Sequence, residues 1–512
     1  MKRRTFLKSA GAAALAAGLT RPARAFVPAH NWHGYDFGSG PVVSNRLNQG
    51  PFPIYAPEEV VPDSSVIMTT TPSKKPLSNF GMGLVTYVCD EAGPPRKEGA
   101  TTAALIEELA AMPLGDKLYI RLDWRDIQSR PGRLDFCDHW KITFEMAEKY
   151  NKRVGLRIQL MSPVIEPHSA PDFVAEKTPM VRLGTTNEIG LPGKVHYAPR
   201  YDNPRFMEAF KEMDSLLAEI YNGHPLVEYV DTAMYGFWGE GHTWPFEGNP
   251  FPDYQTAENT FVEMFEHQLK NWDKTPLTTN TQPDWSRVGN SELLDRTIRS
   301  HNWLRTDTIF IENRQIEALS NRPAWIGATI ENGMSDGRPE TLRLVDGVPR
   351  TENIFYHAKD VGPNYMSLWN WHRIRADRIK NYYDQYPEAI DDLRAVLGYR
   401  ARPSWIWHFE KEGHPGLVLG LVNDGIAGVP GVLYVRVFST DGAVDVRGGI
   451  DAGLPLPGGK VRQAMLMLPK GTAWEGLRLA AEIEVKGQRY PVQWACRETC
   501  NPDGSLTLKK NV

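Results

Sequence analysis

The stretch KLYIRLDWRDIQSRPGRLDFCDHWKITFEMAEKYNKRVGLRIQLMS, residues 117–162, decides the fold. Its first part, 117–124, is short and largely apolar, which predicts a buried strand. Residues 138–151 carry apolar side chains at helical spacing and predict an amphipathic helix. A second apolar run at 153–162 predicts another strand. Strand, helix and strand in this order indicate a β-α-β unit with a parallel sheet.

The same alternation continues on both sides of this stretch. Strands are expected at 79–88, 117–124, 153–162, 227–240, 275–282, 303–308, 323–331 and 364–371. Helices are expected at 101–112, 138–151, 203–223, 256–272, 291–301 and 381–398, with a polar helix before the seventh strand. Eight strand–helix units favour a (β/α)8 barrel. The alternative is an open doubly wound sheet with fewer strands, but the chain lacks the Gly-rich first turn of dinucleotide-binding folds.

Four segments are expected along the chain. They are a twin-arginine signal peptide at 1–25, an extended arm at 26–78, the barrel at 79–398 and a β-sandwich at 399–512. The sandwich is predicted because short apolar runs separated by turn residues replace the strand–helix alternation after about residue 400. A long Pro- and Gly-rich insertion at 162–202 interrupts the barrel pattern.

The first 25 residues have the pattern of an export signal. A basic start containing Arg3 and Arg4 precedes an Ala/Leu-rich run, and an Ala-x-Ala site ends at Ala25. The paired arginines resemble a twin-arginine signal, so we expect export by that machinery to the periplasm or the medium. The alternative is an N-terminal membrane anchor, for which the apolar run is short. We expect no membrane span in the mature chain.

The bulk composition limits the functional classes. The 512 residues are 41% hydrophobic and 23% charged, and the net charge of −4 gives no electrostatic case for a nucleic-acid partner. Fifteen Trp and 19 Tyr suit a carbohydrate partner as well as a core. No motif predicts a cofactor or a metal site. Cys496 and Cys500 are close enough in sequence for a disulfide, with two free thiols as the alternative.

The candidate site residues come from the predicted carboxyl ends of the strands, where barrels of this kind place their active groups. Glu240 and Glu331 are the candidate catalytic residues. The candidate substrate-binding residues are Arg121, Asp123, Trp124, Arg157, Trp238, His242, Trp244, Asn280, Trp285, Arg305, Asp307, Asn332, Trp369, Asn370 and Trp371. This inventory contains carboxylates, amides and Trp, without a Ser or Cys nucleophile motif or a zinc motif.

The two glutamates point to glycoside hydrolysis. That reaction needs two carboxyl groups beside the scissile bond, one protonated to assist the leaving oxygen and one ionised. Strands four and seven of an eight-stranded barrel end across its mouth from each other. Glutamates there could approach to the roughly 5 Å that a retaining mechanism requires.

Several of these segments resemble clan A glycoside hydrolases, and within them the bacterial β-galactosidase-like proteins with a C-terminal β-sandwich. The similar segments are YIRLDWRDIQSRPGRLDF (119–136), RVGLRIQ (153–159), GFWGEGHTW (236–244), LRTD (304–307), PAWIGATIENG (323–333) and LGYR (397–400). The resemblance implies that Glu240 is the general acid/base and Glu331 the nucleophile. Two departures stand out. Gly239 occupies the position where many relatives have Asn, and Ser129-Arg130 precede Pro131 where relatives often have Glu.

Other interpretations remain open from the sequence. The barrel could be a non-catalytic carbohydrate-binding or envelope glycan assembly protein, and a metal-dependent barrel hydrolase has little support. Asp307 or Glu312 could replace Glu331 if a strand boundary shifts. Arg121 and Arg157 could pair with carboxylates inside the barrel or bind an anionic sugar.

Overall fold

The structure is a computed structural model that describes residues 65–90, 93–164, 168–186, 192–243, 246–281, 290–308, 318–332, 350–369 and 374–511. The predicted signal peptide and most of the predicted arm lie outside these ranges. The chain forms two compact units. One comprises Pro76–Tyr399 with Val485–Gln488, and the other combines the described residues before Pro76 with Arg400–Glu484 and the residues from Arg489 onward.

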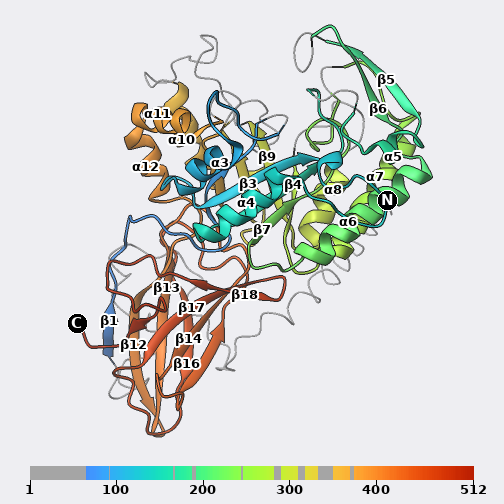
Figure 1. Cartoon of the computed structure of the whole chain (residues 1–512). Coiled ribbons are helices and arrows are strands. Elements are labelled where there is room, and N and C mark those ends of the chain that lie inside the picture. Colours follow the sequence, from blue (N-terminus) through green and yellow to red (C-terminus); the bar gives the residue numbers. More distant parts are fainter. Residues whose placement is uncertain are drawn as a thin grey trace, which may run out of the picture. The chain divides into compact units, whose positions relative to one another are not determined.

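The first unit is a closed barrel of parallel strands, which confirms the predicted (β/α)8 fold (Figure 1). In spatial order, its strands are β2 (Gly83–Tyr87), β3 (Lys117–Asp123), β4 (Arg153–Gln159), β7 (Val227–Asp231), β8 (Leu277–Asn280), β9 (Trp303–Thr308), β10 (Ala328–Glu331) and β11 (Tyr365–Ser367). All seven residues of β3 are buried, because helices cover one face of a barrel strand and the packed lumen covers the other.

Helices surround the strands. They are α3 (Thr102–Ala111), α4 (Asp138–Lys149), α6 (Pro204–Tyr221), α7 (Tyr254–Asn271), α8 (Asn290–Arg299), α10 (Arg350–Val361), α11 (Ala376–Gln385) and α12 (Pro387–Arg394). Thr101 caps α3 by accepting a hydrogen bond from the Ala104 amide at 3.2 Å. The single closing helix expected at 381–398 is wrong, because Pro387 cannot continue a helix and instead begins α12. Among the described helices, none has the length and apolar character for a membrane crossing.

The predicted fourth strand, 227–240, is wrong over its second half. Strand β7 ends at Asp231, and Glu240 follows nine residues later in a loop. Positive φ angles break the extended conformation in this loop, at Gly236 (74°), Trp238 (55°) and Gly239 (76°) among others. The end of the strand therefore presents Asp231, and the loop presents Glu240.

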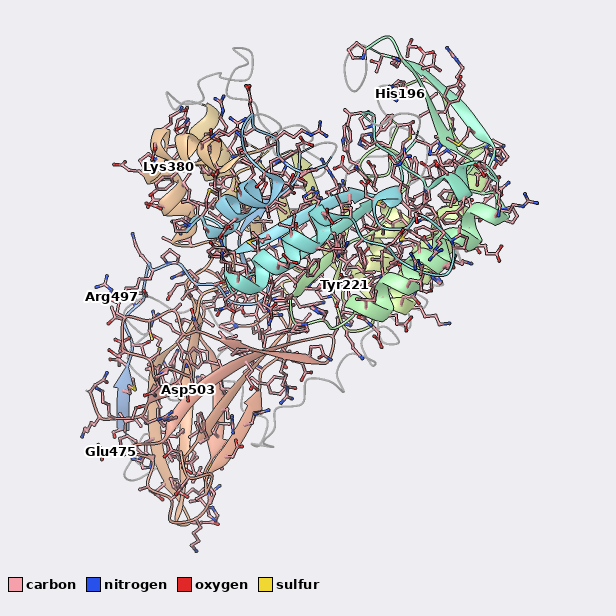
Figure 2. All side chains as sticks on the ribbon, viewed as in Figure 1. His196, Tyr221, Lys380, Glu475, Arg497 and Asp503 are labelled. Atoms are coloured by element: carbon pink, nitrogen blue, oxygen red, sulfur yellow. The ribbon has the colours of Figure 1, made fainter. Side chains whose placement is uncertain are left out.

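The insertion between β4 and α6 has structure of its own. It contains the short helix α5 (Asp172–Ala175) and an antiparallel hairpin of β5 (Met180–Thr185) and β6 (Val195–Pro199). The ring of His196, labelled in Figure 2, lies 4.8 Å from that of Phe246. The Gly248 amide donates to the carbonyl of Leu183 at 3.0 Å. The hairpin thus packs on the loop that follows β7.

The second unit is the predicted β-sandwich. Its sheets are β1 (Ser65–Thr69), β12 (Ala401–Lys411), β13 (His414–Asn423) and β16 (Arg462–Met467), and β15 (Asp445–Gly449), β14 (Val432–Phe438), β17 (Arg478–Val485) and β18 (Gln488–Val492), with β19 (Leu506–Thr507) beside β17. Trp405, Phe409 and Val418 form part of its core. Strand β1 belongs to the segment expected to be an extended arm and pairs with β12.

Cys496 and Cys500 are free thiols in the structure, so the predicted disulfide is not formed. Both sulfurs lie near the same acceptor, the carbonyl oxygen of Glu498, at 4.0 Å and 3.9 Å. The two side chains are therefore neighbours that share a backbone contact. The structure therefore agrees with the alternative interpretation, in which Cys496 and Cys500 are two free thiols.

The barrel lumen is filled by aromatic and charged side chains. A Cβ atom added at Gly155 of β4 would lie 2.5 Å from the Tyr229 ring. At the amino end of the strands, buried Glu228 accepts hydrogen bonds from the Tyr365 hydroxyl at 2.7 Å and the Gly81 amide at 2.9 Å. The lumen is thus a packed core beneath the mouth of the barrel.

Gly155→Ala is expected to destabilise the protein by about 1–3 kcal/mol, because the new methyl group overpacks against Tyr229. Urea unfolding of the purified protein measures this loss. Gly155→Ala combined with Tyr229→Leu, which removes the obstructing ring, serves as the control and is expected to show positive coupling between the two sites. Additive effects of the two changes would contradict the packing described here.

Candidate functional site

Arg157 is the first of two buried arginines at the carboxyl ends of the strands. Its Nε and Nη2 each lie 2.9 Å from Oδ2 of Asp231, the last residue of β7. Its Nη1 lies 3.0 Å from Oε1 of Glu240 and donates to the Trp238 carbonyl at 2.8 Å. One guanidinium therefore joins the end of β7 to the loop that carries Glu240.

Arg305 of β9 is the second buried arginine. It forms an ion pair with Glu331, the last residue of β10, and its Nη1 lies 3.4 Å from Oδ2 of Asp231. The Tyr87 hydroxyl donates to Oε1 of Glu331 at 2.5 Å and accepts from Arg305 at 3.2 Å. Glu331 is thus oriented by a cation and a phenol.

Asp231 stands between the two arginines. It also accepts hydrogen bonds from the Tyr119 hydroxyl, at 2.6 Å, and from Thr278. Burial alone would raise the pKa of Asp231, but the charges of Arg305 and Arg157 outweigh burial and lower it. A continuous chain of opposite charges consequently runs from Glu240 through Arg157, Asp231 and Arg305 to Glu331.

Glycine positions Glu240 in its loop. The Phe237 amide donates to the carbonyl of His242 at 2.9 Å, and the Trp238 amide donates to that of Met161 at 3.0 Å. A Cβ atom at Gly236 would lie 1.9 Å from the His242 carbonyl oxygen, so only glycine fits there. Residue 239 is different, because its Cβ would meet nothing closer than Cδ of Arg157 at 3.5 Å.

Glu240 is buried and ionised. Burial raises its pKa, but the hydrogen bond from His242 and the Arg157 charge overcome that effect and bring the pKa to about 2. His242 Nε2 lies 3.4 Å from Oε2 of Glu240. A general acid must be protonated before it acts. The lowered pKa of Glu240 favours its ionised form in the free protein, and its role as proton donor stays a prediction.

Aromatic side chains close one side of the cluster. The Trp369 ring stacks on Tyr87 with a centroid distance of 4.9 Å, and its Nε1 donates to the Cys89 carbonyl at 3.2 Å. The Arg121 guanidinium lies over the same indole at 5.7 Å. Arg121 and Trp369, both predicted for the site, therefore belong to the lumen beside Glu331's partner Tyr87.

Two candidate substrate-binding residues are held elsewhere. Trp124 is fully buried, its ring packs edge-on against Phe206, and its Nε1 donates to Gln128 at 2.8 Å. Protein side chains enclose its indole in the free protein, and its role in substrate binding stays a prediction. Asn332 donates to the Tyr382 hydroxyl on α11 at 3.1 Å.

The remaining candidates divide by location. Asn280 is buried as the last residue of β8, and Asp123 is buried as the last residue of β3. Outside the described residues lie Trp244, Trp285, Glu312, Asn370 and Trp371, together with the side chain of Asp307.

Sequence reasoning missed Asp231, Tyr87 and Tyr119. Asp231 follows the short apolar run VEYV, and a strand boundary drawn there would have made it the strand-end acid. The two tyrosines stand within apolar strands, where a ring is expected to fill the core. Their hydroxyls reach the carboxylates across the lumen, a contact that depends on barrel closure.

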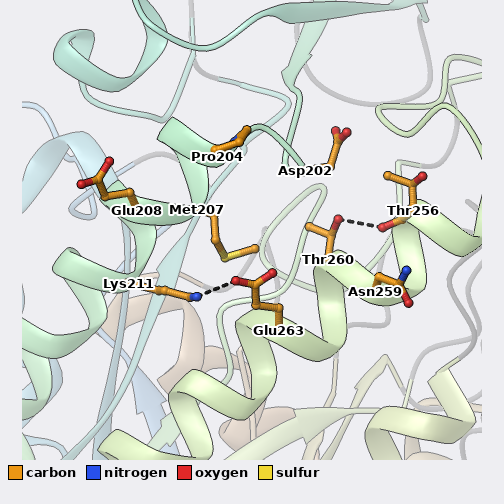
Figure 3. Close-up of a pocket in the computed structure, with 9 residues that line it drawn as sticks. All are labelled: Asp202, Pro204, Met207, Glu208, Lys211, Thr256, Asn259, Thr260 and Glu263. Atoms are coloured by element: carbon orange, nitrogen blue, oxygen red, sulfur yellow. Dashed lines mark hydrogen bonds and ion pairs between the residues drawn. The ribbon is translucent and has the colours of Figure 1, made fainter.

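No group of three or more His, Cys, Asp or Glu side chains suited to a metal ion is found in the described part of the chain. A surface pocket of about 670 Å³ lies between α6 and α7 (Figure 3). Nζ of Lys211 lies 2.5 Å from Oε1 of Glu263. Figure 3 shows this ion pair among the residues that line the pocket. None of the predicted site residues lines this pocket.

Solved glycoside hydrolases resemble this chain. A cold-adapted β-galactosidase from a Rahnella species matches 65% of the chain and 59% of its own length, with 12% identity and a TM-score of 0.38. A family 5 enzyme from Prevotella bryantii, crystallised with a xyloglucan tetradecasaccharide, matches 64% of the chain and 99% of its own length, with 11% identity and a TM-score of 0.36. An exo-β-1,4-mannosidase from an Opitutaceae bacterium covers 62% of the chain and 55% of its own length, with 9% identity and a TM-score of 0.35.

The chain spans less than two thirds of the length of the Rahnella enzyme. No protein-family model matches the sequence, and a search of curated proteins found no match.

Gly236→Ala and Gly239→Asn are expected to differ in stability. Both positions have positive φ, but Gly236 lacks space for a Cβ, whereas Asn tolerates the left-handed conformation and position 239 has room. Urea unfolding should show a loss of at least about 2 kcal/mol for Gly236→Ala and under about 1 kcal/mol for Gly239→Asn. Equal losses would contradict this loop geometry.

Proposed function

We propose that this protein hydrolyses O-glycosidic bonds of an oligo- or polysaccharide by a retaining, double-displacement mechanism. The observation that carries the proposal is the chain of buried contacts joining Glu240, Asp231 and Glu331 through two arginines. Barrels use the carboxyl ends of their strands for catalysis, and glycoside hydrolysis requires two carboxyl groups there. The resemblance of segments 236–244 and 323–333 to clan A enzymes supports the same assignment.

Glu331 is proposed as the nucleophile. Its oxygen attacks the anomeric carbon while the bond to the leaving oxygen breaks and that oxygen takes up a proton from a carboxylic acid of the protein. Arg305 and the Tyr87 hydroxyl hold the carboxylate in one orientation. In the second step, water attacks the anomeric carbon, the bond to Glu331 breaks, and Glu240 accepts the proton of the water. Glu240 is ionised and can accept this proton, and its low pKa makes it a weak base in the free protein.

A neutral sugar is the proposed substrate. Arg157 and Arg305 are two of the cations that an anionic sugar could bind, but carboxylates already pair with both. The other candidate, Arg121, lies over the Trp369 ring. Displacing either guanidinium would leave a buried carboxylate without its partner, which costs several kcal/mol. The charge balance of the site therefore favours an uncharged ring over a uronate or a sulfated glycan.

A carbohydrate-binding or envelope glycan assembly protein without catalysis is the second candidate. Gly239 favours it, because the amide that many relatives offer to the sugar 2-OH is missing at this position. The two candidates differ in turnover. A glycan array identifies ligands under either function, whereas measured release of reducing ends from a bound glycan supports only the hydrolase.

We also propose export through the twin-arginine pathway to the periplasm or the medium, which the sequence of residues 1–25 supports. Fractionation of cells that produce the full chain tests this. Replacement of Arg3 and Arg4 by Lys is expected to retain the protein in the cytoplasm.

Glu331→Gln and Glu240→Gln are expected to lower kcat by at least about 100-fold, since each removes a group that takes part in bond making or proton transfer. Rates are measured on a panel of aryl glycosides and on any glycan that the wild type cleaves. Azide is expected to restore turnover of the Glu240 variant on activated substrates and to release a glycosyl azide of retained configuration.

Glu247→Gln is the matched control, because this glutamate is exposed in the same region of the chain and is expected to leave the rate unchanged. Wild-type turnover in either the Glu240 or the Glu331 variant would rule out its proposed role.

A further inference from the structure

Asp123 occupies the lumen at the carboxyl end of β3. Alternate residues of a strand share a face, and two such residues of β3 mark the inner face: Tyr119 bonds to Asp231, and Arg121 lies over Trp369. Asp123 is next on this face. The register of β3 and β4 pairs Arg121 with Arg157 and Asp123 with Gln159. Asp123 therefore lies one layer above the arginine that binds Glu240, on the side of the barrel mouth.

Asp123 differs from the other carboxylates of the site. Asp231, Glu240 and Glu331 each contact an arginine, whereas Oδ1 of Asp123 is buried without a hydrogen-bond partner among the described residues. Only 3% of its surface is exposed. A carboxyl group buried without a contacting cation favours its protonated form, because burial penalises the charge more than the neighbouring groups stabilise it.

The groups around Asp123 have opposing effects on its pKa. Burial raises the pKa of Asp123 to about 7, and the Asp126 charge adds to the rise. The Ser169 hydroxyl, the Gln159 amide and the Arg121 charge offset only part of it. Arg121 also lowers the pKa of Glu240, so the charge of one residue reaches both carboxyl groups.

We propose that Asp123 is the proton donor to the leaving-group oxygen, an inference that rests on the proposed function. Under this proposal, the group that donates a proton in the first step, Asp123, differs from the group that accepts one in the second step, Glu240. As the bond from the anomeric carbon to the leaving oxygen breaks, that oxygen takes the proton of Asp123 and the anomeric carbon bonds to Glu331. Water then replaces Glu331, and its proton passes to Glu240. The return of that proton to Asp123 through solvent restores the starting state.

The test is the behaviour of Asp123→Asn beside Glu240→Gln. A protonated donor with a pKa near 7 makes kcat/KM of the wild type fall as the pH rises above about 7. Asp123→Asn is expected to abolish this basic limb. It should lower kcat/KM by about 100- to 10,000-fold on phenyl glycosides and only slightly on dinitrophenyl glycosides, whose leaving groups need no proton.

Glu240→Gln is expected to show the opposite pattern. It should keep the basic limb and accumulate the glycosyl-enzyme intermediate, seen as a burst of dinitrophenol, because its defect lies in the second step. Asp138→Asn is the matched control, since this aspartate is exposed at the start of α4 and has no role in the proposed chemistry. Carbon-13 NMR of aspartate-labelled protein should show a carboxyl resonance titrating near pH 7 that is missing from Asp123→Asn.

The outcomes separate the two proposals. A wild type that cleaves no glycoside overturns the proposed function, and the donor role falls with it. A wild type that cleaves glycosides while Asp123→Asn keeps the basic limb and its activity on phenyl glycosides overturns the donor role alone. An Asp123 variant that fails to fold leaves the NMR titration and the wild-type pH profile as the tests, and the absence of a transition near pH 7 in both contradicts the inference.

Discussion

The contact of Asp231 with two buried arginines is the constraint on which the rest of the site depends. Each guanidinium uses its remaining donors on a different glutamate, so the position of one carboxylate fixes the other two. Removing one member of such a buried cluster typically costs about 3–5 kcal/mol, because a charge is left without its partner. The tyrosine hydroxyls and Thr278 complete the hydrogen bonds of the central carboxylate. The cluster therefore couples the geometry of the site to the closure of the barrel.

The surroundings of the carboxyl groups in this site also shift their pKa values in opposite directions. Glu240 and Asp231 have lowered pKa values because cations or donors face them, whereas Asp123 has a raised one because burial dominates. Pairs of titratable groups whose environments push their pKa values apart are typical of acid–base catalysis. The register of β3 and β4 places Asp123 one layer above Arg157, the arginine that contacts both Asp231 and Glu240.

The sequence predicts the barrel well because each strand is a short apolar run between turn residues, and eight such runs alternate with helices. It predicts the position of Glu331 for the same reason, since the run ATI ends on that residue. The prediction fails at Glu240. The run from 227 to 240 is largely apolar apart from Glu228, Asp231 and Thr232, and the positive φ angles at residues 236, 238 and 239 show that it is a strand followed by a loop. The roles of Tyr87 and Tyr119 depend on contacts across the lumen, between residues far apart in the sequence. The helix predicted at 381–398 runs through Pro387, where the chain starts a second helix.

The hairpin of β5 and β6 packs on the loop that holds Glu240, through His196 against Phe246 and through Leu183 beneath Gly248. Insertions of this kind commonly diverge between related barrels, because the strands tolerate long loops at their ends. Under the proposed function, divergence here is constrained, because the hairpin residues that pack on this loop also support the position of Glu240. Changes in substrate preference within this architecture would therefore tend to arise from the outer edge of the hairpin, at exposed positions such as Val195 and Tyr197, and leave its inner face intact.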